Sequence, residues 1–301
     1  MITGLRPLST SELLDRTFHL YRNHFWVFTG ISAIPQLFIL PLTLGGAAMT
    51  MRQNQTWSII MTVAGYLLFY LAIFISQAPT VVAVSNAQLQ KPIGIGSSYS
   101  GAGRSFLRVV WIVFLLGLIS GAIFGGGGSL ISLAIAAIAA VSPTAVSVTA
   151  GLLLTVVPGY FALRWMLGWS LAIPVTVIEG GWFLSSFRRS LKLSKGDRWR
   201  IFVIYFLMGL LSFVLAFIIE FLLMLGIAFL RIRNPHTFQA LMQAIWAVCI
   251  FVSTSLVGGL AMIALSLVYY DQRVRKEAFD LQLMMATLES KPDTAAAAGN
   301  I

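Results

Sequence analysis

The chain has 301 residues, of which 58% are hydrophobic and only 10% are charged. Soluble domains carry about 25% charged residues, and they could not bury this much apolar surface. The composition therefore excludes an ordinary soluble domain and indicates a protein that is solvated by lipid. The net charge of +10 does not indicate nucleic-acid binding, because no basic block is interleaved with base-stacking aromatic residues. We expect anionic lipid headgroups to be the partners of these cations.

Six long apolar runs follow one another along the chain, each long enough to cross a bilayer core of ~30 Å. They cover residues 25–50, 57–89, 109–140, 145–178, 200–230 and 238–270. The sequence thus predicts an all-α membrane protein with about six transmembrane helices. We expect one polytopic membrane domain over residues 1–270, followed by a partly disordered tail over residues 271–301.

The third run is interrupted by Gly125–Gly128. Two crossings and a turn would need about 40 residues, and the run is shorter than this, so we expect one bent span. A re-entrant loop is the alternative. Gly117, Gly121 and Gly125 recur every fourth residue and predict a face for close helix packing.

The lysines and arginines are distributed unequally between the connections. Sixteen lie in the N-terminal segment, the second-to-third and fourth-to-fifth connections and the tail, against Arg52, Arg231 and Arg233 in the others. Since cytoplasmic loops collect basic residues, this predicts that both termini are cytoplasmic.

Amphipathic helices are predicted to precede spans one and five. Ser9 and Glu12 have the spacing of a capping box, and Leu14, Phe18, Tyr21 and Phe25 then recur on one face, which is typical of a helix in the membrane interface. The second such helix carries Leu184, Phe187 and Leu191 on its apolar side. Its polar side carries Arg188, Arg189, Lys192 and Lys195. These four residues are candidates to contact lipid headgroups, and an anchor that only fixes topology is the simpler alternative.

Trp26, Trp111 and Trp199 stand at the starts of spans one, three and five, at spacings of 85 and 88 residues. This spacing predicts a threefold internal repeat, in which each unit is one interfacial helix followed by two spans. The three indole rings are expected to act as belt anchors at the headgroup level.

Two charged residues fall well inside predicted spans, namely Arg164 in run four and Glu220 in run five. Counted at 1.5 Å per residue from the basic side, they lie at similar depths of ~21 and ~25 Å. Because an isolated charge in the bilayer is costly, we expect the two to approach each other. The pair would be a structural lock or, alternatively, a contact for a transported substrate or ion.

The sequence offers no candidate for catalysis, metal binding or cofactor binding. His19 and His24 fall on the opposite side of the membrane from His236, so the three cannot form one metal site. Phosphate-binding, hydrolase and metalloprotease motifs are absent. Cys249 is the only cysteine and lies in an apolar run, where it behaves as a small apolar residue. We therefore expect a protein that is not an enzyme.

Two segments carry a family resemblance. The opening Leu-Arg-Pro-Leu-Ser-Thr-Ser-Glu-Leu-Leu-Asp-Arg-Thr-Phe-His-Leu-Tyr-Arg (5–22) resembles the start of the bacterial glycerophosphoryl diester phosphodiesterase membrane domain. A second signature is similar at Arg164-Trp165, Pro174, Glu179-Gly180, Arg189 to Gly196 and Trp199-Arg200. The resemblance implies a stand-alone bacterial inner-membrane protein without the catalytic domain that can follow this unit.

Together these observations predict a non-catalytic scaffold, accessory subunit or lipid-interacting element, with the lipid bilayer and a membrane protein as possible partners. A small transporter or permease that uses the Arg164/Glu220 region is the alternative.

Overall fold

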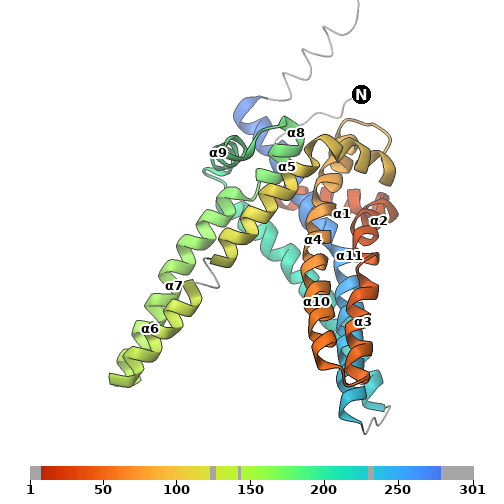
Figure 1. Cartoon of the computed structure of the whole chain (residues 1–301). Helices are drawn as coiled ribbons and strands as arrows, with labels where there is room; N and C mark the ends of the chain where they lie inside the picture. Colours follow the sequence, from red (N-terminus) through yellow and green to blue (C-terminus); the bar gives the residue numbers. More distant parts are fainter. Residues whose placement is uncertain (1–7, 123–126, 142–143, 230–233, 279–301) are drawn as a thin grey trace, which may run out of the picture.

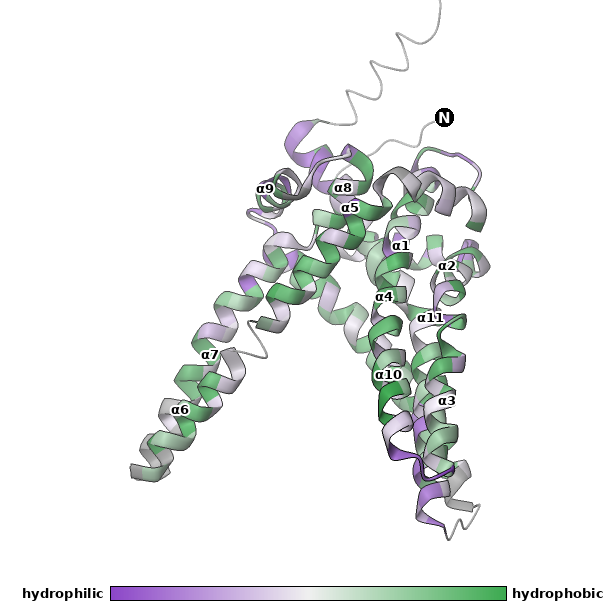
Figure 2. Cartoon of the chain, viewed as in Figure 1, coloured by the Kyte–Doolittle hydropathy of each residue, from purple (hydrophilic) through white to green (hydrophobic). Residues whose placement is uncertain are grey.

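The fold is described from a computed structural model, which covers residues 8–122, 127–141, 144–229 and 234–278. These residues form eleven helices and no strand. Figure 1 shows two arms that meet at one end of the molecule and diverge toward the other. Green predominates along both arms in Figure 2, whereas purple segments gather where the arms meet and at the lower end of the right-hand arm. The all-helical class that was predicted from the sequence is confirmed.

The first arm is a bundle of helices that correspond to the first, second, fifth and sixth predicted runs. The first span is the bent pair α2 (Phe25–Leu37) and α3 (Leu40–Met51), whose axes differ by 46°. Pro35 lies inside α2 and Pro41 opens α3, which explains the bend. The bundle is completed by α4 (Gln55–Gln88), α10 (Arg198–Phe229) and α11 (Pro235–Glu277).

The second arm consists of α6 (Gly127–Val141), α7 (Thr144–Trp169) and the lower part of α5 (Ile95–Gly121). The axis of α5 turns by 82° between Ile95–Gly103 and Ser105–Gly121. Three shorter helices lie near the junction of the arms: α1 (Thr10–Asn23), α8 (Ala172–Glu179) and α9 (Phe183–Ser194).

Among the described residues, four helices could cross a membrane by length and composition, or up to six if each bent pair counts as one span. Six spans were predicted, and the bent pair over Ile95–Gly121 overlaps the third predicted run, 109–140, only in part. The predicted break at Gly125–Gly128 falls partly outside the described residues, and α6 begins at Gly127, so the choice between a kink and a re-entrant loop stays a prediction.

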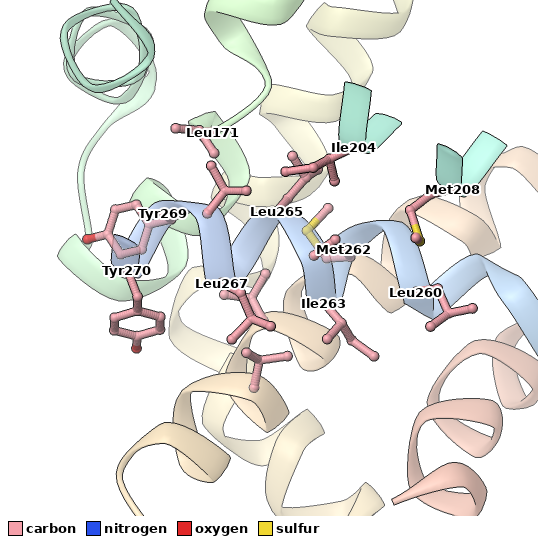
Figure 3. Close-up of a cluster of buried hydrophobic side chains, with 14 of the residues drawn as sticks. Leu171, Ile204, Met208, Leu260, Met262, Ile263, Leu265, Leu267, Tyr269 and Tyr270 are labelled. Carbon is pink, nitrogen blue, oxygen red and sulfur yellow. The ribbon is translucent and has the colours of Figure 1, made fainter. Parts of the chain in front are cut away.

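The central element of the fold is α11. Its most apolar window is 56% buried inside the protein, compared with 17% for α4 and α10. Figure 3 shows how Leu260, Ile263 and Leu267 project from α11 into a cluster that Ile204 joins from α10 and Leu171 joins from the turn before α8. Because lipid tails are as apolar as these side chains, their contacts stabilise helix association in a bilayer through van der Waals packing and not through removal from water.

The domain boundary predicted at residue 270 falls inside a continuous helix. From Tyr270 onward α11 runs unbroken to Glu277, and Asp271 and Gln272 are buried. Residues 271–277 are therefore part of the folded domain. Asp271 and Glu277 in this stretch form ion pairs with Arg200 and Arg189 at the junction of the arms.

Close helix packing through glycine occurs at a different place from the one predicted. A Cβ added at Gly117 or Gly121 would meet nothing within 4 Å. At Gly46 an added Cβ would lie 2.4 Å from the hydroxyl of Thr62, and at Gly65 it would lie 2.5 Å from Thr43. The contact between α3 and α4 therefore requires glycine, whereas the spacing of glycines in α5 does not mark a contact within the described chain.

Candidate functional site

Four charged side chains and one tyrosine form a cluster, here called the α8–α9–α11 cluster, where these three helices converge. Arg189 of α9 donates from Nε to Glu179 at 3.0 Å and forms an ion pair with Glu277 at 2.5 Å. The hydroxyl of Tyr269 donates to Glu179 at 2.8 Å. Arg273 lies 3.4 Å from the Glu277 carboxylate. Two carboxylates and two guanidinium groups thus balance one another.

The geometry around Glu179 follows from the local sequence. Gly180 ends α8 in the left-handed conformation, at φ 70°, which glycine adopts without a steric penalty. Its carbonyl accepts a hydrogen bond of 2.7 Å from Arg108 of α5. This arrangement fixes the last residue of α8 beside Arg189. The hydrogen bond to Glu277 raises the pKa of the Arg189 guanidinium, against the opposing effect of partial burial.

A second cluster, the Asp271 cluster, ties the start of the described chain to α10 and α11. The Asp271 side chain is fully buried and lies 2.5 Å from Arg200 and 2.9 Å from Arg275. Asp271 also accepts a hydrogen bond of 2.7 Å from the backbone N–H of Leu8, and Arg200 donates to the Leu8 carbonyl at 2.7 Å. Because both guanidinium groups and the Leu8 backbone engage the Asp271 carboxylate, this cluster holds the three segments together.

The predicted basic helix is present as α9, but its four basic residues do not share one environment. Arg189 belongs to the α8–α9–α11 cluster. Arg188, Lys192 and Lys195 are exposed on the face of α9 that points away from the rest of the protein. No ion pair involves them within the described chain.

The face of α9 that packs on the protein also differs from the predicted one. Ser186, Phe187, Ser190, Leu193 and Ser194 are buried, whereas Leu184 is exposed. The hydroxyl groups of Ser190 and Ser194 donate to the Gly168 carbonyl of α7 at 2.8 and 3.2 Å. Small hydroxyl residues therefore set the buried face, which a search for leucine periodicity misses.

Arg164 and Glu220 are not brought together by the structure. Arg164 is exposed on α7, and Glu220 of α10 lines a cavity to which Arg164 does not contribute. The two helices also diverge away from the junction (Figure 1). Ion pairs among the described residues do not join them. A count along the sequence estimates depth alone and cannot detect the direction in which each helix runs.

Glu220 instead lines a cavity of about 280 Å³ between α10 and α11. Ser212, Trp246, Cys249 and Thr254 are among the other lining residues. The hydroxyl of Ser253, which also lines this cavity, is buried without a hydrogen-bond partner. The cavity thus combines one carboxylate with several hydroxyl groups in apolar surroundings.

Comparisons with protein-family models, with curated proteins and with solved structures find no match to this chain.

The carboxylates of the two clusters were missed as site residues by the sequence analysis. Glu179, Asp271 and Glu277 belong to a chain with only ten acidic residues, and all three stand near the ends of apolar runs beside basic segments. An acidic residue in an otherwise basic connection is the signal that could have found them, since such a residue neutralises a neighbouring cation.

Proposed function

We propose that this chain is a non-catalytic protein of the bacterial inner membrane that contacts anionic lipid headgroups through α9. Arg188, Lys192 and Lys195 form the contact surface, here called the α9 basic face. One observation carries the proposal: these three side chains are exposed, while the carboxylates nearest to them in the fold are engaged elsewhere. Glu179 and Glu277 contact Arg189, and Asp197 lies 3.9 Å from Lys276.

The orientation that the proposal requires is the one predicted from the basic connections, with both termini in the cytoplasm. The N-terminal helix α1, the α4–α5 connection, α9 and the end of α11 all lie near the junction of the arms (Figure 1). Placed at a negatively charged leaflet, each lysine or arginine contributes about 1 kcal/mol of attraction. The resemblance to the stand-alone membrane domain supports the same setting.

The test compares two triple variants of the full chain in lipid nanodiscs. Arg188→Gln/Lys192→Gln/Lys195→Gln removes the α9 basic face, and Arg52→Gln/Arg231→Gln/Arg233→Gln removes the same charge from the other connections. We expect phosphatidylglycerol to raise the unfolding temperature of wild type and of the second variant more than phosphatidylcholine does. The first variant should lose most of this difference. Equal lipid dependence in both variants would refute the proposed role of α9.

Transport is a second candidate function, and the Glu220 cavity is the observation that favours it. A carboxylate and an unpartnered buried hydroxyl group in one intramembrane cavity are typical of a substrate or ion pathway. Arg164 is not part of this cavity, so the candidate depends on Glu220 alone.

Vesicles loaded with a pH-sensitive dye and containing the full chain test this candidate with the proton as probe. A flux driven by a membrane potential and abolished in Glu220→Gln would support transport of protons. The control is Cys249→Ala, which changes the same cavity without removing its charge. If wild-type and protein-free vesicles show the same flux, proton transport is excluded.

A further inference from the structure

Where α7, α9 and α10 meet, two arginines have no anionic partner among the described residues. Arg198 is the first residue of α10, and its Nε is buried without a hydrogen-bond partner. Arg164 is exposed on α7, and no described ion pair involves it. Both charges would be costly near the apolar part of a membrane without a counter-ion.

The two arginines lie close to one another along α7, near Gly168. A Cβ added at Gly168 would lie 3.7 Å from the guanidinium of Arg198 and 2.7 Å from Leu191 of α9, so Arg198 lies over this glycine. Arg164 precedes Gly168 by four residues, which places it ~6 Å lower on nearly the same face of the helix. Arg198 is therefore placed at Gly168, where α7, α9 and α10 meet, and the helical spacing places Arg164 one turn away on α7.

The surroundings suit a lipid better than a soluble anion. Trp165 and Trp199, the neighbours of the two arginines, are 58% and 74% exposed, and indole rings favour the headgroup region of a bilayer. Below the arginines α7 and α10 diverge (Figure 1). Their exposed side chains there are apolar, for example Val157 and Phe161 on α7 and Leu210 on α10.

We propose that Arg164 and Arg198 bind the phosphate group of one anionic phospholipid, whose acyl chains extend between α7 and α10. The inference rests on the proposed role in lipid contact and adds a specific site to it. Guanidinium groups suit this ligand because their planar N–H donors match the oxygens of a phosphate, and charge-assisted hydrogen bonds are the strongest of their kind.

The experiment measures binding of phosphatidylglycerol and phosphatidylcholine to the full chain, purified in a nonionic detergent, by titration in native mass spectrometry. The variants are Arg164→Gln, Arg164→Gln/Arg198→Gln and the control Arg52→Gln, which removes the same kind of charge at the end of α3, outside both proposed lipid contacts. We expect phosphatidylglycerol to bind the double variant at least about tenfold more weakly than wild type, since hydrogen bonds to charged groups contribute about 1.5–3 kcal/mol. Arg52→Gln should retain the affinity of wild type for phosphatidylglycerol.

Arg164→Gln keeps the test decisive if the double variant does not fold, because Arg164 is exposed and its replacement breaks no contact described here. It should weaken phosphatidylglycerol binding while phosphatidylcholine binding stays unchanged. Unaltered phosphatidylglycerol affinity in Arg164→Gln would overturn the proposal. So would competition by free glycerol phosphate at equal concentration, because the ligand would then be a soluble phosphate.

These outcomes are separate from those for the α9 basic face. If only the α9 triple variant loses its response to phosphatidylglycerol, the site at Arg164 and Arg198 is wrong and the proposed function stands. If only the Arg164 and Arg198 variants lose binding, the site stands and the role of α9 is wrong.

Discussion

Arg200 of α10 lies 2.5 Å from the carboxylate of Asp271, whose side chain is fully buried on α11. The same carboxylate accepts a hydrogen bond from the backbone of Leu8. One buried anion thus joins α10, α11 and the residue that precedes the cap of α1. Such an ion pair need not be more stable than an apolar replacement, but the loss of one partner leaves a buried charge.

Asp271→Asn is therefore expected to destabilise the protein by about 3–5 kcal/mol, because Arg200 would lose its buried counter-ion. Thermal unfolding in detergent, followed by circular dichroism, measures the effect. Asp15→Asn is the matched control, since Asp15 is exposed on α1 and its replacement should change stability by less than ~0.5 kcal/mol. Equal stability of the two variants would show that the Asp271 cluster is not required for the fold.

Arg189 and Arg188 are neighbours with different expected roles. Arg189→Gln removes the contacts to Glu179 and Glu277 and should destabilise the protein by about 1 kcal/mol, a modest value because these groups are partly exposed. Arg188→Gln should leave stability unchanged and affect only the response to anionic lipid. Unfolding temperatures of both variants, in detergent without lipid, check this difference. A larger loss in Arg188→Gln would contradict the assignment of the two residues.

Gly46→Ala should destabilise the α3–α4 contact by about 1–3 kcal/mol, as overpacking does. The added methyl group would lie 3.2 Å from the backbone nitrogen of Thr62 and 3.3 Å from the carbonyl oxygen of Ser58, and neither atom can move away freely. Gly117→Ala is the control, because nothing lies within 4 Å of its Cβ position. The unfolding temperature of Gly46→Ala should therefore be lower than that of Gly117→Ala. A loss of stability in Gly117→Ala alone would instead support the glycine face that was first predicted in α5.

Much of the fold could be predicted from the sequence, since apolar runs report directly on helices that need lipid around them. The run at 57–89 corresponds to α4 (Gln55–Gln88), and the run at 200–230 corresponds to α10 (Arg198–Phe229). The capping box was also found, and Ser9 accepts from the backbone of Glu12 while Glu12 accepts from Ser9. The threefold repeat of tryptophan-marked units stays a prediction.

The charged contacts could not be predicted in the same way, because they depend on how helices cross in space. Arg164 and Glu220 have comparable positions along their spans, yet α7 and α10 diverge (Figure 1). Glu179 and Glu277 meet Arg189 only because α8, α9 and α11 converge at one end. Sequence separation carries no information on such a meeting.

The most direct test of the central claim is the side of the membrane on which α9 lies. Single cysteines are introduced by Arg188→Cys or Gln53→Cys in a Cys249→Ala background, and a membrane-impermeant maleimide is applied to intact spheroplasts and to inside-out vesicles. The account predicts that position 188 reacts only in inside-out vesicles and position 53 only in spheroplasts. Labelling of both positions from the same side, or of position 188 in spheroplasts, would contradict it.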